Sequence, residues 1–135
     1  MMGAIQQHFV RFYSPGTFVA ETTDKPIDSW DVEKAVKMAR KIKERYDATP
    51  WGFQFVTRGR GPDDLDSKET ARSPMYHLGG RIETLAEVEA RNDPKEEILR
   101  SNMRGNKYDR IVINDNSWRS TQPLREGDVV LDFKP

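Results

Sequence analysis

The sequence predicts an α+β fold: a mainly antiparallel sheet of about five to seven strands, one long amphipathic helix and two short helices. Three observations support this. Residues 51–60 (WGFQFVTRGR) alternate aromatic or β-branched residues with other side chains, as a strand does. Residues 32–46 instead repeat apolar side chains at helical spacing. Short turn sequences separate most strand-like segments, which favours antiparallel neighbours over parallel ones.

Length and composition indicate a single domain that covers residues 1–135. The chain is 36% hydrophobic and 33% charged, while its 10% aromatic content argues against disorder. A chain with so many polar residues can bury only a small hydrophobic core. We therefore expect it to form a homo-oligomer. Lys plus Arg equals Asp plus Glu, at 22 each, so the formal net charge is zero. A protein that coats nucleic acid is usually basic, so any nucleotide site must be a local patch.

The chain contains no cysteine, which excludes disulfides, thiolate nucleophiles and cysteine metal sites. The N-terminal residues lack the basic region and apolar stretch of a secretory signal. No apolar run approaches the ~20 residues that span a membrane. We therefore expect a soluble cytoplasmic protein without a membrane partner.

The first elements are two strands and a helix. Residues 7–13 (QHFVRFY) alternate as a strand, and a Ser-Pro-Gly turn leads to a return strand at 17–21. Residues 22–26 are expected to form a polar loop. Asp28 or Ser29 can cap the helix at 32–46, which ends before Pro50.

The central strand ends in a basic, glycine-spaced segment, Arg58-Gly59-Arg60-Gly61. Glycine lets the backbone approach a ligand closely, and the arginine guanidinium suits phosphate or carboxylate groups. The following loop, expected at 59–72, is long for a compact domain, and such loops are often functional. The alternative is a solvated turn whose arginines pair with the nearby aspartates.

The second half is expected to begin with a hairpin over residues 75–84, turning at Gly79-Gly80. Thr84 and Glu87 form a capping box for a short helix at 85–91. A second short helix follows Pro94 and ends at Gly105. Strands are expected at 110–114 and 129–133.

A polar segment, 114–121 (NDNSWRST), follows the first of these strands. A nucleotide base can stack on Trp118 while Asn114 and Asn116 contact its edge. The alternative is that Trp118 covers the core and its neighbours form turns, since Asn, Asp and Ser are common turn residues.

Arginine outnumbers lysine ten to four after residue 50. Because arginine favours bidentate and stacked contacts, this bias indicates contacts to an anionic ligand or to the acidic surface of a protein. In the ligand hypothesis three arginines bind phosphates and an aromatic ring stacks on the base. The candidate ligand-binding residues are Arg58, Arg60, Arg72, Tyr76, Asn114, Asn116, Trp118 and Arg119.

No motif fixes a reaction. The two histidines are His8 and His77, and the positions two residues later hold Val10 and Gly79. Two-histidine phosphoesterases carry a hydroxyl residue there, so that pattern is absent. Zinc-protease, phosphate-loop and dinucleotide motifs are also absent. We therefore expect no catalytic residue, metal or cofactor, while a metal-dependent nuclease or phosphodiesterase built on Asp and His remains a third hypothesis.

The segments FYSPGTFVAE, WGFQFVTRGR, YHLGG and NSWRSTQPL resemble small accessory proteins of tailed phages and prophages along the whole chain. The resemblance implies a phage accessory protein of the host cytoplasm rather than a virion component or a housekeeping enzyme. Small phage accessory proteins include inhibitors of bacterial immunity. Such inhibitors either sequester a nucleotide signal or block a host defence protein. The resemblance includes no mechanistic motif, so no binding residue is transferred from it.

Overall fold

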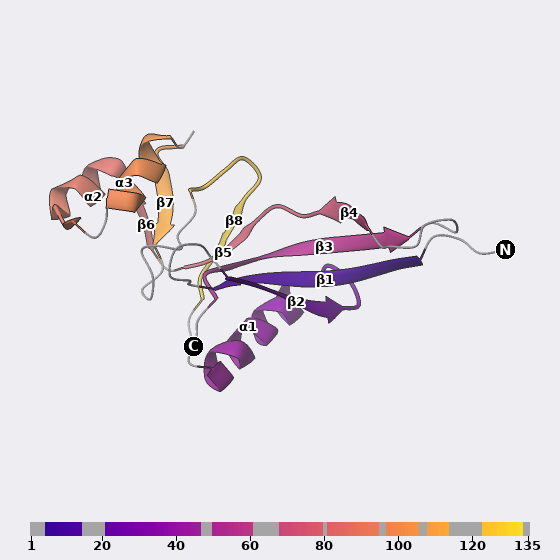
Figure 1. Cartoon of the computed structure of the whole chain (residues 1–135). Coiled ribbons are helices and arrows are strands. Elements are labelled where there is room, and N and C mark those ends of the chain that lie inside the picture. The colour runs from indigo at the N-terminus through magenta and orange to yellow at the C-terminus, as the bar shows by residue number, and fades with distance from the viewer. Residues whose placement is uncertain are drawn as a thin grey trace.

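The computed structural model describes residues 5–14, 21–46, 50–60, 68–79, 81–94, 97–105, 108–113 and 123–133. In these residues it confirms an α+β fold with a mainly antiparallel sheet and three helices (Figure 1). The elements in chain order are β1 (Ile5–Ser14), β2 (Glu21–Ile27), α1 (Val32–Tyr46), β3 (Gly52–Arg60), β4 (Lys68–Arg72), β5 (Tyr76–Leu78), β6 (Arg81–Thr84), α2 (Leu85–Arg91), α3 (Glu97–Arg104), β7 (Arg110–Ile113) and β8 (Val129–Leu131).

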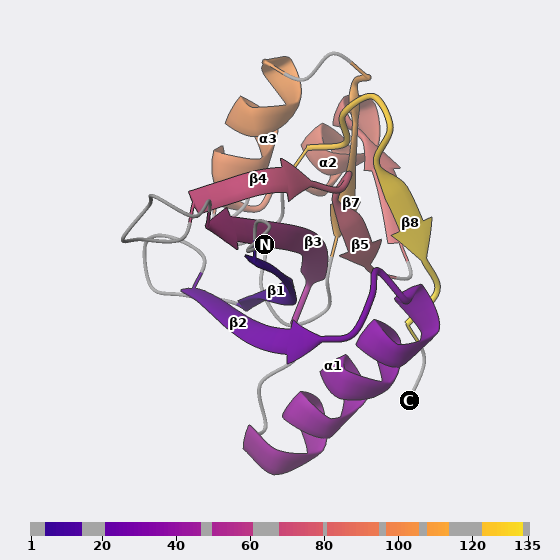
Figure 2. The same cartoon turned by 90° about the vertical axis from the view of Figure 1, so that its right-hand side faces the viewer.

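The main sheet has six strands, in the order β2-β1-β3-β5-β8, with β4 paired to β3 as well. Its pairs are antiparallel, except that β8 runs parallel to β5. The expected central strand is confirmed, because β3 pairs with β1, β4 and β5. In Figure 2, helix α1 lies along one side of this sheet, and strand β4 lies far from the helix.

The main core lies between the sheet and α1. Val10 and Phe12 of β1 and Phe53 and Phe55 of β3 are fully buried in one cluster with Ala35 of the helix. Side chains alternate between the two faces of a strand. The positions between these residues therefore point to the opposite face, which is the face that carries the polar groups described below.

Helix α1 occupies the expected place and packs Ala35 and Ala39 into the core. The backbone of Lys34 donates to the Asp31 side chain at 3.2 Å, so Asp31 caps the first turn. The helix has 15 residues. This is close to the ordinary length of a globular helix, so the expectation of a long helix was too strong.

The segment expected to be a polar loop at 22–26 is instead part of β2. It pairs with β1 from Ser14↔Glu21 to His8↔Ile27. Its polar side chains and Pro26 gave no strand pattern. An edge strand accepts both, because one side makes no ladder bonds and one face meets water. The return strand expected at 17–21 lies outside the described residues except for Glu21.

The loop expected at 59–72 also contains a strand. β4 pairs with β3 from Gly59↔Lys68 to Val56↔Arg72, with a register shift after Thr57. All five of its residues are exposed, so no buried face could produce a hydrophobic pattern. A bulged, lysine-bearing edge strand is a common protection against unwanted strand pairing.

The hairpin expected over 75–84 is wrong, because β5 and β6 belong to different sheets. Gly79 lies at the crossing, where a Cβ atom would stand 2.4 Å from Cγ1 of Val112. The glycine therefore allows close packing of the backbone against β7. A tight reversal between two strands is not its role.

The second part of the chain forms a small unit of β6, β7, α2 and α3 with its own buried cluster, which includes Val88, Leu99 and Ile111. The expected cap is confirmed: Oγ1 of Thr84 accepts the backbone N–H of Glu87 at 3.3 Å. Buried Glu83 pairs with Arg91, which ties α2 to β6.

Candidate functional site

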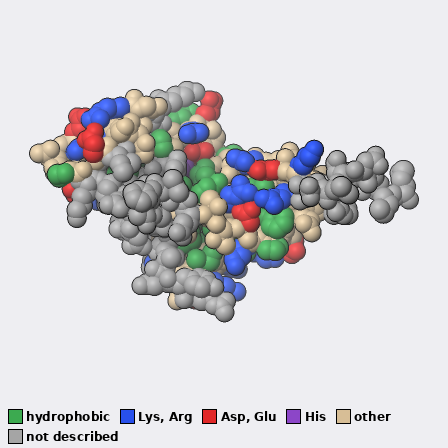
Figure 3. Space-filling model, in the orientation of Figure 1, with side chains coloured by type: hydrophobic (Ala, Val, Ile, Leu, Met, Phe, Trp, Pro, Cys, Tyr) green, Lys and Arg blue, Asp and Glu red, His purple; other side chains and the backbone are tan. Residues whose placement is uncertain are grey.

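The face of the sheet away from α1 carries a continuous set of charged side chains. Arg11 of β1 lies opposite Asp24 of β2, and Arg58 of β3 lies opposite Glu69 of β4. Figure 3 shows basic and acidic side chains gathered where Figure 1 draws β3 and β4. Because directly paired residues share a face, the strand register itself assembles this cluster.

Asp24 is the acidic centre of one half of the cluster. Arg11 binds it in a bidentate manner, at 2.8 Å to Oδ1 and 3.1 Å to Oδ2. Arg58 adds a longer contact of 3.7 Å to Oδ2. The hydrogen bonds from Arg11 lower the pKa of Asp24, against the opposing effect of partial burial. Arg58 therefore takes part in an internal ion pair rather than standing free.

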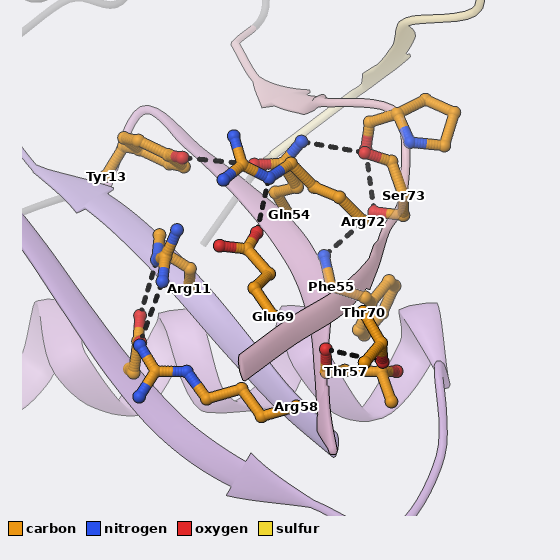
Figure 4. A network of polar contacts seen from close by, with 12 residues as sticks. Arg11, Tyr13, Gln54, Phe55, Thr57, Arg58, Glu69, Thr70, Arg72 and Ser73 are labelled. Atoms are coloured by element: carbon orange, nitrogen blue, oxygen red, sulfur yellow. Dashed lines mark hydrogen bonds and ion pairs between the residues drawn. The ribbon is translucent and has the colours of Figure 1, made fainter. Parts of the chain in front are cut away.

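Glu69 and Arg72 form the second half, with Nε of Arg72 2.5 Å from the Glu69 carboxylate (Figure 4). This hydrogen bond lowers the pKa of Glu69 and raises that of Arg72. The Arg72 side chain remains about half exposed. An exposed ion pair contributes little stability, so Arg72 can exchange its partner at low cost.

Beside Arg72 lies a pocket of about 400 Å³. This volume falls within the range of small-molecule sites. Three separate segments supply its walls: the end of β1 with the start of β3, the β4–β5 connection, and residues 123–128. The lining residues are Tyr13, Trp51, Gln54, Arg72, Pro74, Met75, His77, Pro123, Arg125, Glu126 and Asp128. We call it the Trp51 pocket.

Asp128 fixes one wall of the Trp51 pocket. Its Oδ1 accepts the backbone N–H of Met75 at 3.3 Å, and its Oδ2 accepts that of Arg125 at 3.0 Å. The same Oδ2 lies 3.0 Å from Nε2 of His77, whose side chain is 1% exposed. One carboxylate therefore connects the turn before β8 to β5, and holds His77 in a fixed orientation.

Two lining residues of the Trp51 pocket, Tyr13 and Gln54, belong to a hydrogen-bond chain that continues to Ser73 (Figure 4). The hydroxyl of Tyr13 donates to Oε1 of Gln54 at 3.1 Å, and Nε2 of Gln54 donates to the carbonyl of Ser73 at 2.8 Å. Oγ of Ser73 in turn accepts the backbone N–H of Phe55 at 2.8 Å. A chain in which each group has a partner holds these side chains rigidly.

Trp51 is 3% exposed and lies against Tyr13, with ring centroids 5.3 Å apart. Its indole Nε1 is buried, and within the described part of the chain it has no hydrogen-bond partner. Buried tryptophan N–H groups usually have a partner. This donor is therefore an unusual feature of the pocket wall.

The candidate residues from the sequence are placed as follows. Arg58 and Arg72 lie on the charged face, and only Arg72 lines the Trp51 pocket. Tyr76 stacks on Phe53 at 5.0 Å in the core, on the opposite face from both arginines. For Arg60 the structure describes only the backbone, which ends β3. Asn114, Asn116, Trp118 and Arg119 lie outside the described residues.

Sequence reasoning missed most of the pocket. Trp51 was assigned to the central strand and Asp128 to a turn. His77 was tested against a two-histidine motif and considered, with Tyr76, as a neighbour of an anionic-ligand site, but its contact with Asp128 was not expected. Their partners are far away in the sequence, as in the contact of His77 with a residue 51 positions later. Nothing in the spacing of Trp51 and His77 along the sequence indicates that these two residues line one pocket.

Among the described residues, no group of three or more His, Asp or Glu side chains is arranged to hold a metal ion. No helix in the described segments is long and apolar enough to cross a membrane. Comparison with protein-family models, curated proteins and solved structures found no match for the chain.

Proposed function

We propose that the protein binds a small phosphate-bearing ligand, a nucleotide in the simplest case, in the Trp51 pocket and holds it without turning it over. One observation carries this proposal. The pocket has an arginine on two of its walls, Arg72 and Arg125, beside a buried indole N–H of Trp51 that has no hydrogen-bond partner among the described residues. Arginine recognises phosphate through a planar set of donors.

The two arginines differ in their present partners. Arg72 is paired with Glu69, whereas the guanidinium of Arg125 makes no ion pair with another described residue. A phosphate group bound between them would add a partner for Arg125 and compete with Glu69 for Arg72.

The resemblance to phage proteins supplies the biological setting of the proposal. A protein that retains a nucleotide signal unchanged in the host cytoplasm would prevent that signal from activating a defence effector. Assembly as a homo-oligomer, which the polar composition favours, would raise the number of sites per particle. Size-exclusion chromatography with light scattering measures that assembly.

Calorimetric titration with inorganic pyrophosphate and the four 5′-nucleoside monophosphates tests ligand binding. Arg72→Ala should weaken binding by about tenfold or more, because a charge-assisted contact is lost. Arg104→Ala is the matched control, since its side chain is equally exposed and also ion-paired, but on α3. Equal effects of the two substitutions, or the absence of binding by every probe, would contradict the proposal.

A separate experiment measures whether the protein converts its bound ligand. Mass spectrometry of the ligand recovered after prolonged incubation should return the added nucleotide unchanged. A stoichiometric complex whose ligand is converted to product would refute retention without turnover and favour an enzyme. Arg58→Ala discriminates the pocket from the basic strand end: the pocket proposal expects little change in affinity, because Arg58 lies against Asp24 rather than in the pocket wall.

A further inference from the structure

Three arginines surround one carboxylate beside the Trp51 pocket. Nε of Arg72 lies 2.5 Å from the Glu69 carboxylate, and Arg58 of β3 is paired with Glu69 of β4. The hydrogen bond from Arg72 lowers the pKa of Glu69, and the charges of Arg72, Arg11 and Arg58 lower it further. Figure 4 shows Glu69 between Arg72 and Arg58. The strand pairing therefore gathers three guanidinium groups on one face of the sheet, next to the pocket.

Two of these arginines face solvent. The side chains of Arg72 and Arg58 are 53% and 41% exposed, whereas that of Arg11 is 16% exposed. Arg11 binds Asp24 in a bidentate manner, while Arg58 lies 3.7 Å from the same carboxylate, which is too far for a hydrogen bond. Exposed ion pairs contribute little stability, so Arg58 and Arg72 can both bind an anion from solution.

Arg58 is also positioned by an aromatic ring. Its guanidinium carbon lies over the ring of Phe9, 5.8 Å from the centroid. This distance is within the range of a cation–π contact. A group that is already positioned loses less conformational entropy when it binds a ligand. Because the planar guanidinium offers several donors to a phosphate group, Arg58 is a prepared phosphate contact outside the pocket.

The position of Arg58 continues from the wall of the pocket. Arg72 lines the Trp51 pocket and faces Val56 of β3, which lies two residues before Arg58 on the same face of that strand. Alternate residues of a strand are ~7 Å apart along its axis. This spacing is comparable with that of successive phosphate groups in a nucleotide chain. A ligand whose first phosphate lies at Arg72 can therefore place its second phosphate at Arg58.

We propose that the ligand of the Trp51 pocket is longer than one nucleotide and that its second phosphate binds Arg58. The first phosphate lies between Arg72 and Arg125, and the ligand leaves the pocket across β3 and β4. The ligand class is thus a short nucleotide chain with at least two phosphate groups. This inference rests on the proposed function and adds a second phosphate site to it. Because Arg72 belongs to both sites, one continuous nucleotide chain suits them better than a separate acidic peptide does.

The test compares three ligands of the same base by calorimetry: the nucleoside 5′-monophosphate, the nucleoside 3′,5′-bisphosphate and the 5′-phosphorylated dinucleotide. We expect the last two to bind about tenfold more tightly than the monophosphate, because each adds a charge-assisted contact. Equal affinity of all three ligands would overturn this inference and leave the proposed function intact. Failure of all three to bind, with each of the four bases, would contradict the proposed function as well.

The variant Arg58→Ala assigns the second phosphate to its contact. It should reduce the affinities for the bisphosphate and the dinucleotide to that for the monophosphate, which should not change. The unchanged monophosphate affinity also shows that the pocket is still folded. Arg104→Ala is the matched control, because its side chain is 52% exposed and lies on α3. An equal loss for all three ligands in Arg58→Ala, or no loss for the dinucleotide, would overturn the inference.

Salt and an acidic peptide complete the test. Raising the salt concentration from about 50 to about 300 mM should narrow the difference between the dinucleotide and the monophosphate, because solvent-exposed charges are screened. A difference that salt leaves unchanged would show that Arg58 does not bind the second phosphate through its charge. Tetraglutamate should not displace the bound dinucleotide. If it binds as tightly and depends equally on Arg58, the surface accepts an acidic peptide and the inference is overturned.

Discussion

Nε2 of His77 lies 3.0 Å from Oδ2 of Asp128, although the two residues are 51 positions apart in the sequence. This contact lies beside the parallel pairing of β5 and β8, the exception in an otherwise antiparallel sheet. It gives one wall of the pocket a fixed position, because the same carboxylate also binds two backbone N–H groups.

Substitution Asp128→Asn should destabilise the protein by about 1–3 kcal/mol, because an amide NH₂ would face donors that now meet a carboxylate. Urea denaturation measures the change in the free energy of unfolding. Asp109→Asn is a suitable control. Asp109 is exposed and has φ of 54°, a conformation that asparagine adopts readily. A loss below about 0.5 kcal/mol in Asp128→Asn would contradict the role of this carboxylate as a structural hub.

Substitution Glu69→Gln should raise the affinity for a phosphate-bearing ligand several-fold. The change removes the charge that now holds Arg72 at 2.5 Å and leaves the guanidinium available to the pocket. Calorimetry with the preferred nucleotide measures the effect. Glu33→Gln on α1 is the control, because it also removes an acid from an ion pair but lies outside the pocket. Unchanged or weaker binding in Glu69→Gln would show that Glu69 does not compete with the ligand.

Substitution Gly79→Ala should cost about 1–3 kcal/mol of stability, because the added methyl would lie 2.4 Å from Cγ1 of Val112. Thermal unfolding of the variant measures this cost. Gly105→Ala is the matched control, since its nearest neighbour would be a backbone oxygen at 3.8 Å. The double variant Gly79→Ala with Val112→Ala has a shorter side chain at position 112. This change should relieve the overlap between the two side chains. Equal melting temperatures for the two single glycine variants would contradict the packing argument.

The stability contributed by Asp24 should depend on pH. Its folded-state pKa is lowered from the ordinary value of 3.8, mainly by the hydrogen bonds from Arg11. The contribution is therefore complete above pH 3.8 and is lost as the pH falls through the lower folded-state value.

Asp24→Asn should accordingly cost about 1 kcal/mol at neutral pH, and the difference from the wild type should shrink below about pH 4. Urea titrations at a series of pH values provide the measurement. Asp28→Asn, at a carboxylate that is 94% exposed, should have little effect at neutral pH. If the loss of unfolding free energy in Asp24→Asn became larger as the pH fell, the ion pair with Arg11 would not be its cause.

The elements that the sequence predicted well are those with a strong local pattern. Alternating large residues identified β3, and Thr84 marked the start of α2 through its side chain. The strands that it missed, β2 and β4, lie at sheet edges with polar or fully exposed residues. Their pairing comes from backbone hydrogen bonds to a neighbour, which leave no trace in local hydrophobicity.

The candidate site also has features that the sequence predicted and features that it missed. An arginine-rich surface was foreseeable from composition, and Arg72 does line the pocket. Tyr76 was chosen as an aromatic residue near the Gly79-Gly80 turn. The structure places its ring on Phe53, because the register of β5 against β3 turns that position toward the core. A shift of one residue in register would have placed it on the other face.

The sequence by itself determined that β3 is a strand, where α1 lies and how α2 is capped, because each depends on contacts within a few residues. The order of these elements indicated the α+β class. Tertiary structure alone decided that Tyr13, Trp51, His77 and Asp128 meet around one pocket. It also decided that Gly79 carries the chain from one sheet to the next. These outcomes depend on which strands pair and which face each strand buries, and the packing of the whole chain sets both.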